Sequence, residues 1–278
     1  MEIRIKCPAK INLTLEIVNK RDDGFHNIKS IMQMISLYDY ISISAEHNSK
    51  TAINLSGNSN EIPYNEKNLV YKASKLFLDE TKIIANINIY IDKSIPISAG
   101  LAGGSTDAAG TLFGLNKIFG EPLNKKDLHR LCASLGSDLN VCLEGGCLLA
   151  TGRGEKTEKL NPIKSPVTLI KPKNLGISAK DAYTKYSLKA IKPKNNMTEK
   201  MVNALKNGEN ITRFLYNDLE YAVFDDYEEL QFIKKILPSS IMSGSGSTYF
   251  VLDNIELNLP DYQVINSLEF INSGVDIA

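Results

Sequence analysis

The chain lacks most of the features that mark nucleic-acid-binding, membrane and secreted proteins. Its 278 residues include no tryptophan and three histidines, and 32 basic residues balance 32 acidic ones. A nucleic-acid partner normally requires a cationic excess, so we expect none, and selectivity for an anion must come from a local site. No run approaches the roughly 18 apolar residues of a membrane span, and the N-terminus has no apolar signal core. These absences predict a cytoplasmic protein with no membrane partner.

The cysteines are too scattered to suggest a metal site or a disulfide framework. Cys7, Cys132, Cys142 and Cys147 form no C-x-x-C pair, and His129 is the one histidine near any of them. Zinc sites and redox motifs usually show such paired spacing, and cytoplasmic thiols are normally reduced. The sequence therefore predicts free thiols.

The order of the predicted elements favours an α+β fold. Strand-like patterns, rich in β-branched residues, occur early at 3–7, 11–18, 28–37, 40–45 and 51–55, and later at 84–91, 147–150, 167–171, 239–242 and 248–252. Helical patterns occur at 68–81 with Asn68 as N-cap, from about 105 to 119, and at 125–135, 179–187, 197–206, 218–224 and 227–236. Strands and helices come in blocks rather than in strict alternation, which is typical of α+β proteins.

A composition shift at 161–166 predicts two domains, residues 1–160 and 161–278. Apolar residues make up 43% of the chain and charged residues 23%, so each part has enough apolar sequence for a core. Residues 189–196, rich in lysine, proline and asparagine, are predicted to form an exposed loop.

The most informative segment is 96–109, which reads P-I-S-A-G-L-A-G-G-S-T-D-A-A. A strand ends, glycines cluster, and Ser105 and Thr106 then begin a helix, whose free N–H groups can bind a phosphate. The alternative is a tight strand-to-helix turn capped by Ser105 or Thr106. The segment has neither the lysine of a P-loop nor the G-x-G-x-x-G dinucleotide pattern, so positive charge must come from elsewhere, for example from Lys10.

Three motifs in the same order resemble the GHMP kinase superfamily: C-P-A-K-I-N at 7–12, the glycine segment at 96–109, and M-S-G-S-G-S-T at 242–248. The last motif alone is equally well explained by a flexible turn. The resemblance implies a two-domain GHMP kinase fold, with an N-terminal domain like ribosomal protein S5 domain 2 and a ferredoxin-like C-terminal domain. It also implies transfer of the ATP γ-phosphoryl group to a hydroxyl. The implied ATP-binding residues are Pro96, Ile97, Ser98, Ala99, Gly100, Leu101, Ala102, Gly103, Gly104, Ser105 and Thr106.

Further segments resemble one branch of this superfamily, at 8–13, 23–26 (D-G-F-H), 135–138 (L-G-S-D), 145–155 (G-G-C-L-L-A-T-G-R-G-E) and 217–220 (N-D-L-E). This branch phosphorylates the 2-hydroxyl of 4-diphosphocytidyl-2-C-methyl-D-erythritol, in the non-mevalonate route to isoprenoid precursors. The resemblance therefore implies a small-molecule partner that is a cytidine diphosphate conjugate, with ATP and Mg²⁺ as cofactors.

Two residues are candidates for the chemistry. Asp138 lies in the otherwise uncharged stretch 132–143, where it is either a base or a helix cap, and spacing alone favours the cap. Lys10 follows a predicted strand and, taken alone, is best explained as a surface lysine. The resemblance implies instead that Asp138 is the catalytic base and that Lys10 pairs with it electrostatically.

Five residues are candidates for binding the acceptor. Phe25 in a turn suggests a stacking surface or, equally, a hydrophobic plug, and Tyr183 is nearly as well explained as a core residue. The resemblance implies that Phe25 and Tyr183 stack on cytosine, that His26 bonds its edge, and that Asn12 and Gly244 contact the substrate.

The sequence also departs from this branch. Ala179 stands where threonine is expected, Asn140 and Val141 replace the more usual residues, and Phe25 replaces a common tyrosine. Asn217 and Asp218 are predicted to be helix N-caps. Two alternatives stay open: a GHMP kinase for mevalonate, phosphomevalonate or homoserine, and a non-catalytic ATP-binding module. Metal ligands and oligomeric state are not assigned by the sequence.

Overall fold

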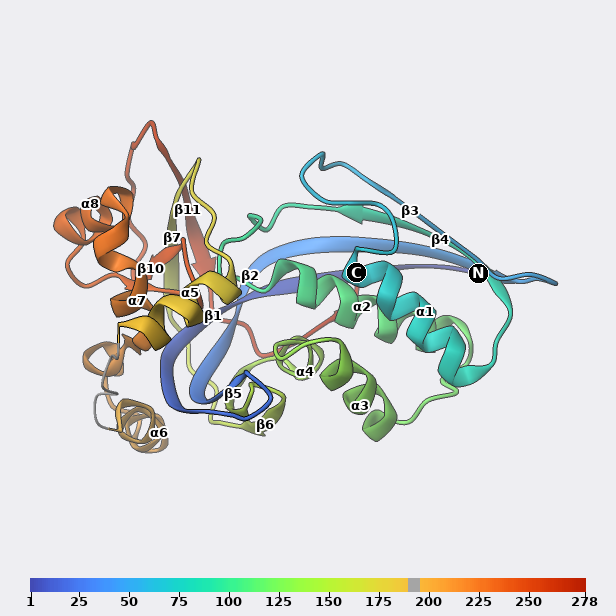
Figure 1. Ribbon diagram of the computed structural model, residues 1–278, viewed down its shortest axis with the longest axis horizontal. Helices are drawn as coiled ribbons and strands as arrows, with labels where there is room; N and C mark the ends of the chain where they lie inside the picture. Colours follow the sequence, from blue (N-terminus) through green and yellow to red (C-terminus); the bar gives the residue numbers. More distant parts are fainter. Residues whose placement is uncertain (190–195) are drawn as a thin grey trace.

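Two long antiparallel strands run through the molecule. The structure is a computed structural model that describes residues 1–189 and 196–278, so the predicted loop at 189–196 lies almost wholly outside the described residues. Strands β1 (Glu2–Lys20) and β2 (His26–His47) pair along nearly their whole length and arch across the molecule (Figure 1). The four separate strands predicted here were wrong, because a register shift between Pro8 and Ala9 accommodates the proline without ending the pairing.

These two strands form the centre of the first sheet. Its order is β12-β1-β2-β4-β3, while β5 pairs with β2 and β6, and β8 pairs with β1. The added strands are β3 (Ala52–Gly57), β4 (Ala85–Asp92), β5 (Cys147–Gly152), β6 (Lys156–Lys159), β8 (Tyr216–Asn217) and β12 (Asp276–Ile277). Strand β2 pairs with β4 over residues 40–47 and with β5 over residues 28–33, so it connects both ends of the sheet.

Four helices cover one face of this sheet (Figure 1). They are α1 (Leu69–Thr81), α2 (Gly103–Ile118), α3 (Lys125–Leu135) and α4 (Leu139–Glu144). Asn68 accepts the N–H of Val70 and so caps α1, which confirms the predicted start of that helix. Strand β4 alternates buried and outward residues, which places Ile87, Ile89 and Ile91 in the core beneath the helices.

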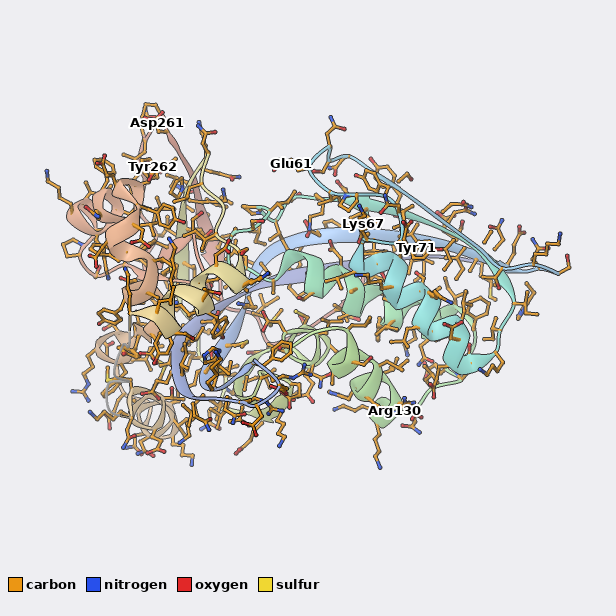
Figure 2. All side chains as sticks on the ribbon, in the orientation of Figure 1. Glu61, Lys67, Tyr71, Arg130, Asp261 and Tyr262 are labelled. Carbon is orange, nitrogen blue, oxygen red and sulfur yellow. The ribbon has the colours of Figure 1, made fainter. Side chains whose placement is uncertain are left out.

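A second sheet has the order β11-β7-β10-β9. Its strands are β7 (Pro166–Pro172), β9 (Ile241–Met242), β10 (Tyr249–Val251) and β11 (Tyr262–Glu269). The accompanying helices are α5 (Ala179–Leu188), α6 (Met197–Asn207), η1 (Thr212–Phe214), α7 (Asp218–Val223), η2 (Phe224–Asp226) and α8 (Glu228–Ile236). Tyr262, at the start of β11 (Figure 2), stacks on Phe232 of α8 with ring centroids 5.4 Å apart, which joins sheet and helix.

The α+β class predicted from the sequence is confirmed by this architecture. Strand β11 was not predicted, because its residues are mostly half-exposed and a register shift between Ile265 and Leu268 interrupts its pattern. The proposed domain boundary falls between β6 and β7 and stays a prediction, since β12 returns to pair with β1. All four cysteines are free and buried. Within the described residues, no helix is long and apolar enough to cross a membrane.

Candidate active site

A cavity of about 820 Å³ opens where β1, the start of α2 and helix α5 converge. We call it the central cavity. Many of the residues singled out from the sequence line it: Lys10, Asn12, Phe25, His26, Gly100, Ala102, Ser105, Asp138, Tyr183 and Gly244. The fold therefore brings together residues from distant parts of the chain, and the wall includes both candidates for the chemistry.

Lys10 and Asp138 face each other in this cavity. The Lys10 ammonium lies 3.6 Å from the Asp138 carboxylate, and the two side chains are 3% and 28% exposed. Lys10 Nζ also donates hydrogen bonds to Asn12 Oδ1 at 2.7 Å and to the Gly100 carbonyl at 2.9 Å. Interpreting Lys10 as a surface lysine was therefore wrong: it lies mid-strand in β1, and three oxygen-bearing groups hold its charge in place.

Asp138 occupies the N-cap position of α4, a helix that the sequence did not predict. Its side chain makes no capping hydrogen bond. The capping role that spacing favoured is therefore wrong for the carboxylate, although the backbone does start a helix there. The carboxylate is available to Lys10 and to a ligand in the central cavity.

The segment 96–106, which we call the 96–106 loop, connects β4 to α2 and includes the first turn of that helix. Helix α2 begins at Gly103 rather than near Ser105, and Ala102 at its N-cap position provides no side-chain cap. Ser105 lines the central cavity, whereas Thr106 is fully buried in the core. A turn capped by Ser105 or Thr106 is therefore excluded, and the start of this helix has no side-chain cap of its own.

Only glycine fits at position 100 of this loop. Gly100 has a φ of +74°, and an added Cβ would lie 2.0 Å from the carbonyl oxygen of Ser243. The 96–106 loop is thus packed directly against the 242–248 loop, so the second and third of the three motifs meet beside the Lys10 ammonium of the first motif.

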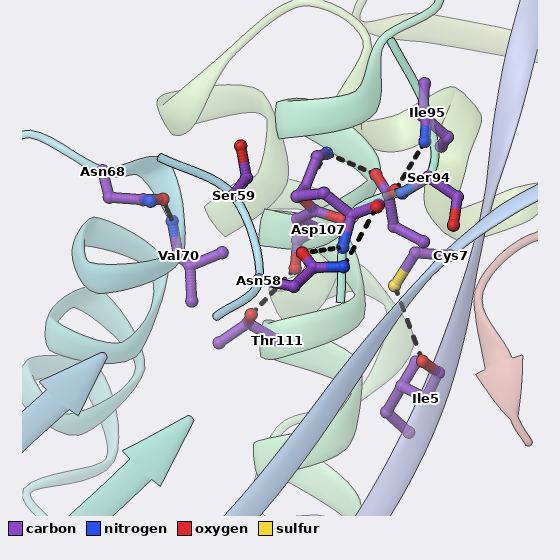
Figure 3. A network of polar contacts seen from close by, with 12 residues as sticks. Ile5, Cys7, Asn58, Ser59, Asn68, Val70, Ser94, Ile95, Asp107 and Thr111 are labelled. Carbon is purple, nitrogen blue, oxygen red and sulfur yellow. Dashed lines mark hydrogen bonds and ion pairs between the residues drawn. The ribbon is translucent and has the colours of Figure 1, made fainter. Parts of the chain in front are cut away.

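A buried charge cluster lies beneath the 96–106 loop. Lys93 bonds to both Asp39 and Asp107, with its ammonium 2.9 Å from Asp107 Oδ2. Asp39 also accepts the N–H groups of Ser94 and Ile95 at 2.6 and 2.8 Å. Burial raises the pKa of Asp107 to about 7 although Lys93 opposes the shift. Figure 3 shows Asp107 of α2 beside Ser94 and Ile95, so the cluster holds both ends of the loop.

The three ring-bearing acceptor candidates take part in two stacked contacts. The rings of His26 and Tyr183 are 5.1 Å apart and nearly parallel, at 18°. The Arg153 guanidinium lies over the Phe25 ring, 5.0 Å from its centroid. Phe25 is 51% exposed, which argues against a plug, and Tyr183 stacks on His26 rather than on Phe25. Burial, with a contribution from Lys20, lowers the pKa of His26. Arg153, which sequence reasoning missed, is the arginine of the G-R-G-E segment.

Asn12 and Gly244 lie beside Lys10. Asn12 accepts from Lys10 and donates from Nδ2 to Ser30 Oγ at 2.8 Å, so its amide orientation is fixed. A Cβ on Gly244 would lie 3.2 Å from Lys10 Nζ, which shows how closely the 242–248 loop approaches the ammonium. The central cavity thus combines the charged Lys10–Asp138 pair, the glycine-rich 96–106 loop and the aromatic rings of Phe25, His26 and Tyr183. We call the side formed by these rings the aromatic wall.

Comparison with known proteins assigns the family. The sequence profile of the GHMP kinases N terminal domain matches residues 68–146. A 4-diphosphocytidyl-2-C-methyl-D-erythritol kinase from Caldanaerobacter subterraneus subsp. tengcongensis is 40% identical over 264 residues, which cover 92% of this chain and 90% of the relative. The chain belongs to the 4-diphosphocytidyl-2-C-methyl-D-erythritol kinase family.

Solved structures agree with this family. A 4-(cytidine 5'-diphospho)-2C-methyl-D-erythritol kinase has a TM-score of 0.73 and 29% identity, covering 91% of this chain and 90% of the other. A homoserine kinase from Cytophaga hutchinsonii has a TM-score of 0.77 at 17% identity, covering 100% of this chain and 97% of the other. At that identity the second match shows the shared fold alone, so the GHMP fold expected from the sequence is confirmed.

Gly104 offers the cleanest test of the 96–106 loop. An added Cβ at Gly104 has its nearest neighbour 3.9 Å away, whereas one at Gly103 would lie 3.0 Å from Lys93 Nζ. We expect Gly104→Val to weaken ATP binding by at least about tenfold, because its methyl groups obstruct phosphate approach to the helix N-terminus. Calorimetric titration with ATP measures this, and thermal unfolding reports whether the fold persists.

The control for that variant is Lys117→Val in the last turn of the same helix, which introduces the same β-branched residue away from the loop. An unchanged ATP affinity in folded Gly104→Val protein would contradict phosphate binding by this loop.

Proposed function

We propose that this kinase transfers the γ-phosphoryl group of ATP to the 2-hydroxyl of 4-diphosphocytidyl-2-C-methyl-D-erythritol. The observation that carries the proposal is the Lys10–Asp138 pair, 3.6 Å apart on the wall of the central cavity. A carboxylate beside a fixed ammonium is suited to accept a hydroxyl proton while the ammonium stabilises negative charge. A protein that only bound ATP would have no use for this pair.

The two residues have distinct proposed roles in the transfer. Asp138 orients the acceptor hydroxyl and takes its proton as the hydroxyl oxygen bonds to the γ-phosphorus, while the bond from that phosphorus to the oxygen bridging to the β-phosphate breaks and ADP leaves. Lys10 neutralises charge on the transferring group, and Asn12 keeps Lys10 in position through its Oδ1. Because phosphoryl transfer is largely dissociative, most of the catalysis comes from alignment and charge stabilisation rather than from the base itself.

ATP is proposed to bind with its phosphates at the 96–106 loop. The uncapped start of α2 offers N–H groups and the positive end of a helix dipole. The described residues contain no group of three or more His, Cys, Asp or Glu that could hold a metal. Mg²⁺ is usually bound by substrate phosphates and one or two protein oxygens, and Ser105 and Asp138 on the cavity wall fit that requirement. Bound Mg²⁺ would neutralise phosphate charge.

The cytidine diphosphate half is proposed to bind along the aromatic wall. Base stacking on an aromatic ring contributes about 1–3 kcal/mol in nucleic-acid-binding proteins, and Phe25 and Tyr183 both line the cavity. Lys20, Arg153 and Lys180 also line it, which supplies positive charge suited to a diphosphate. Binding energy from this remote half can align the hydroxyl with the γ-phosphate.

Acceptor competition tests the function. With ATP present, we expect turnover of 4-diphosphocytidyl-2-C-methyl-D-erythritol and little or none of mevalonate and homoserine, because neither carries a cytidine diphosphate group. ADP release under identical conditions measures all three. Phe25→Ala should raise the KM for the cytidyl acceptor by about tenfold or more, given the stacking energy, and leave the KM for ATP nearly unchanged.

The matched control is Tyr90→Ala, which removes an exposed aromatic ring on β4 outside the central cavity. Efficient phosphorylation of mevalonate or homoserine, with none of the cytidyl acceptor, would reject this substrate and leave the fold assignment intact.

A further inference from the structure

The N-D-L-E segment at 217–220 is buried between β1 and the 242–248 loop. Asn217 accepts the Leu219 N–H at 2.9 Å, which confirms it as the N-cap of α7. Asp218 is not a cap, contrary to the prediction, because its carboxylate accepts the Ile17 N–H at 2.6 Å. Asp218 is the first residue of α7 and directly follows β8, which pairs with β1, so its carboxylate bonds to the backbone of β1 rather than to its own helix.

The amide of Asn217 has a second task. Its Nδ2 donates to the carbonyl of Met242 at 2.7 Å and to that of Gly244 at 2.8 Å. Glu220 accepts the Met242 N–H at 2.9 Å. Two side chains of this segment therefore hold three backbone groups of the 242–248 loop, and Asn217 itself is fully buried and does not line the cavity.

The loop held in this way reaches the catalytic centre. Ser243 Oγ donates to the Gly100 carbonyl at 3.0 Å, and the same carbonyl accepts Lys10. Gly244 and Ser245 line the central cavity. Among the described residues, no hydrogen-bond acceptor is found for the N–H of Gly244 or of Ser245.

The planarity of the peptide bond connects these observations. In a trans peptide, a carbonyl and the following N–H point in opposite directions. Because the Gly244 carbonyl points inward to Asn217, the Ser245 N–H points the other way. We propose that Asn217 is a positioning residue, which fixes the Gly244–Ser245 peptide so that the Ser245 N–H donates to a phosphate of a bound substrate. This inference rests on the proposed kinase function.

Because residue 244 is a glycine, the direction of the Gly244–Ser245 peptide depends on the hydrogen bond from the Asn217 amide. Gly244 has a φ of +55°, a region from which glycine can leave at little cost, so its own conformation does not fix the direction of the peptide. If the peptide turned over, a carbonyl oxygen would face the phosphates in place of an N–H. A repulsive group would then replace a hydrogen-bond donor.

The test replaces the donor with an acceptor. Asn217→Asp keeps the oxygen that caps α7 but sets a carboxylate against two carbonyls. We expect kcat to fall about 100-fold, the scale of losing one backbone-type donor to a developing charge. The matched control is Asn116→Asp, another buried asparagine whose amide joins the N–H and carbonyl of Leu123, outside the central cavity. The control should lose comparable stability and keep kcat within about threefold.

Two binding measurements on Asn217→Asp identify the phosphate that the Ser245 N–H contacts. A weaker affinity for the ATP analogue AMP-PNP assigns the contact to ATP, and a weaker affinity for CDP assigns it to the acceptor. A fall in kcat with both affinities intact means that the N–H acts on the phosphoryl group during transfer. Equal kcat in folded Asn217→Asp and Asn116→Asp overturns the inference.

A second variant keeps the inference testable if Asn217→Asp does not fold. Asn217→Ser retains a good N-cap and one donor without a buried charge, and should reduce kcat about tenfold at near-normal thermal stability. Wild-type kcat from this variant also overturns the inference. The proposed function is tested separately, by whether the wild-type enzyme turns over the cytidyl acceptor. The ratio of variant to wild-type kcat can be measured with any acceptor that the enzyme phosphorylates.

Discussion

Replacing Asp138 with asparagine is expected to lower kcat by about 10²- to 10⁴-fold. The amide has nearly the same shape as the carboxylate, but it cannot accept the hydroxyl proton. Since Asp138 provides no cap to α4, the variant should retain the wild-type fold. Steady-state kinetics give kcat, and titration with CDP and with ATP should show affinities that change far less than turnover.

The control for Asp138 is Asp181→Asn, which alters an exposed carboxylate in the first turn of α5 that does not line the central cavity. Near-normal turnover of folded Asp138→Asn would rule out Asp138 as the base. A loss of only about tenfold would instead favour an orienting role, as dissociative transfer permits.

Lys10→Ala is expected to produce a loss of the same size, about 10²- to 10⁴-fold in kcat. The ammonium holds together the Asp138 carboxylate, Asn12 Oδ1 and the Gly100 carbonyl. Its removal leaves the Asp138 carboxylate without its counter-charge and Asn12 Oδ1 without the Lys10 donor, while the Gly100 carbonyl keeps the hydrogen bond from Ser243 Oγ, so the thermal midpoint should also fall. Rapid-quench measurement of a single turnover reports the chemical step.

Lys10→Met separates charge from packing, because it keeps most of the aliphatic stem. Compared with Lys10→Ala, Lys10→Met should recover part of the lost thermal stability and none of the lost kcat. Lys6→Ala, earlier on β1 and outside the central cavity, controls for loss of a lysine from this strand. Recovery of turnover in Lys10→Met would mean that the side chain acts through packing alone.

Local sequence signals predicted the parts of the fold that depend on local physics. Helices α1 and α3 were both predicted, and Asn68, the predicted cap of α1, accepts a backbone N–H, as does Asn124 at the start of α3. The glycine-rich loop and its helix were predicted from the cluster of glycines after a strand, although α2 begins at Gly103 rather than near Ser105. Helix α4 escaped prediction because it is short and its N-cap side chain does not cap it.

The pairings of the active site depend on the fold and not on local pattern. Lys10 and Asp138 come from segments far apart in the chain, so composition and spacing favoured a surface lysine and a helix cap. The family resemblance suggested their pairing, and the structure places them 3.6 Å apart. The Lys93 cluster had no such signal, because Asp39 and Lys93 are 54 residues apart and neither lies in a motif.

The unbroken course of β1 and β2 limits how the molecule can move. Strand β1 is paired with β2 beside the α1–α4 layer, and farther along Glu16 accepts the N–H groups of Met197 and Thr198 at the start of α6. Within the described residues 2–47, β1 and β2 stay paired along this ribbon, so a hinge rotation there would have to break ladder hydrogen bonds. Lys10, which pairs with Met34 of β2, therefore keeps its position in the site unless this ladder is disrupted.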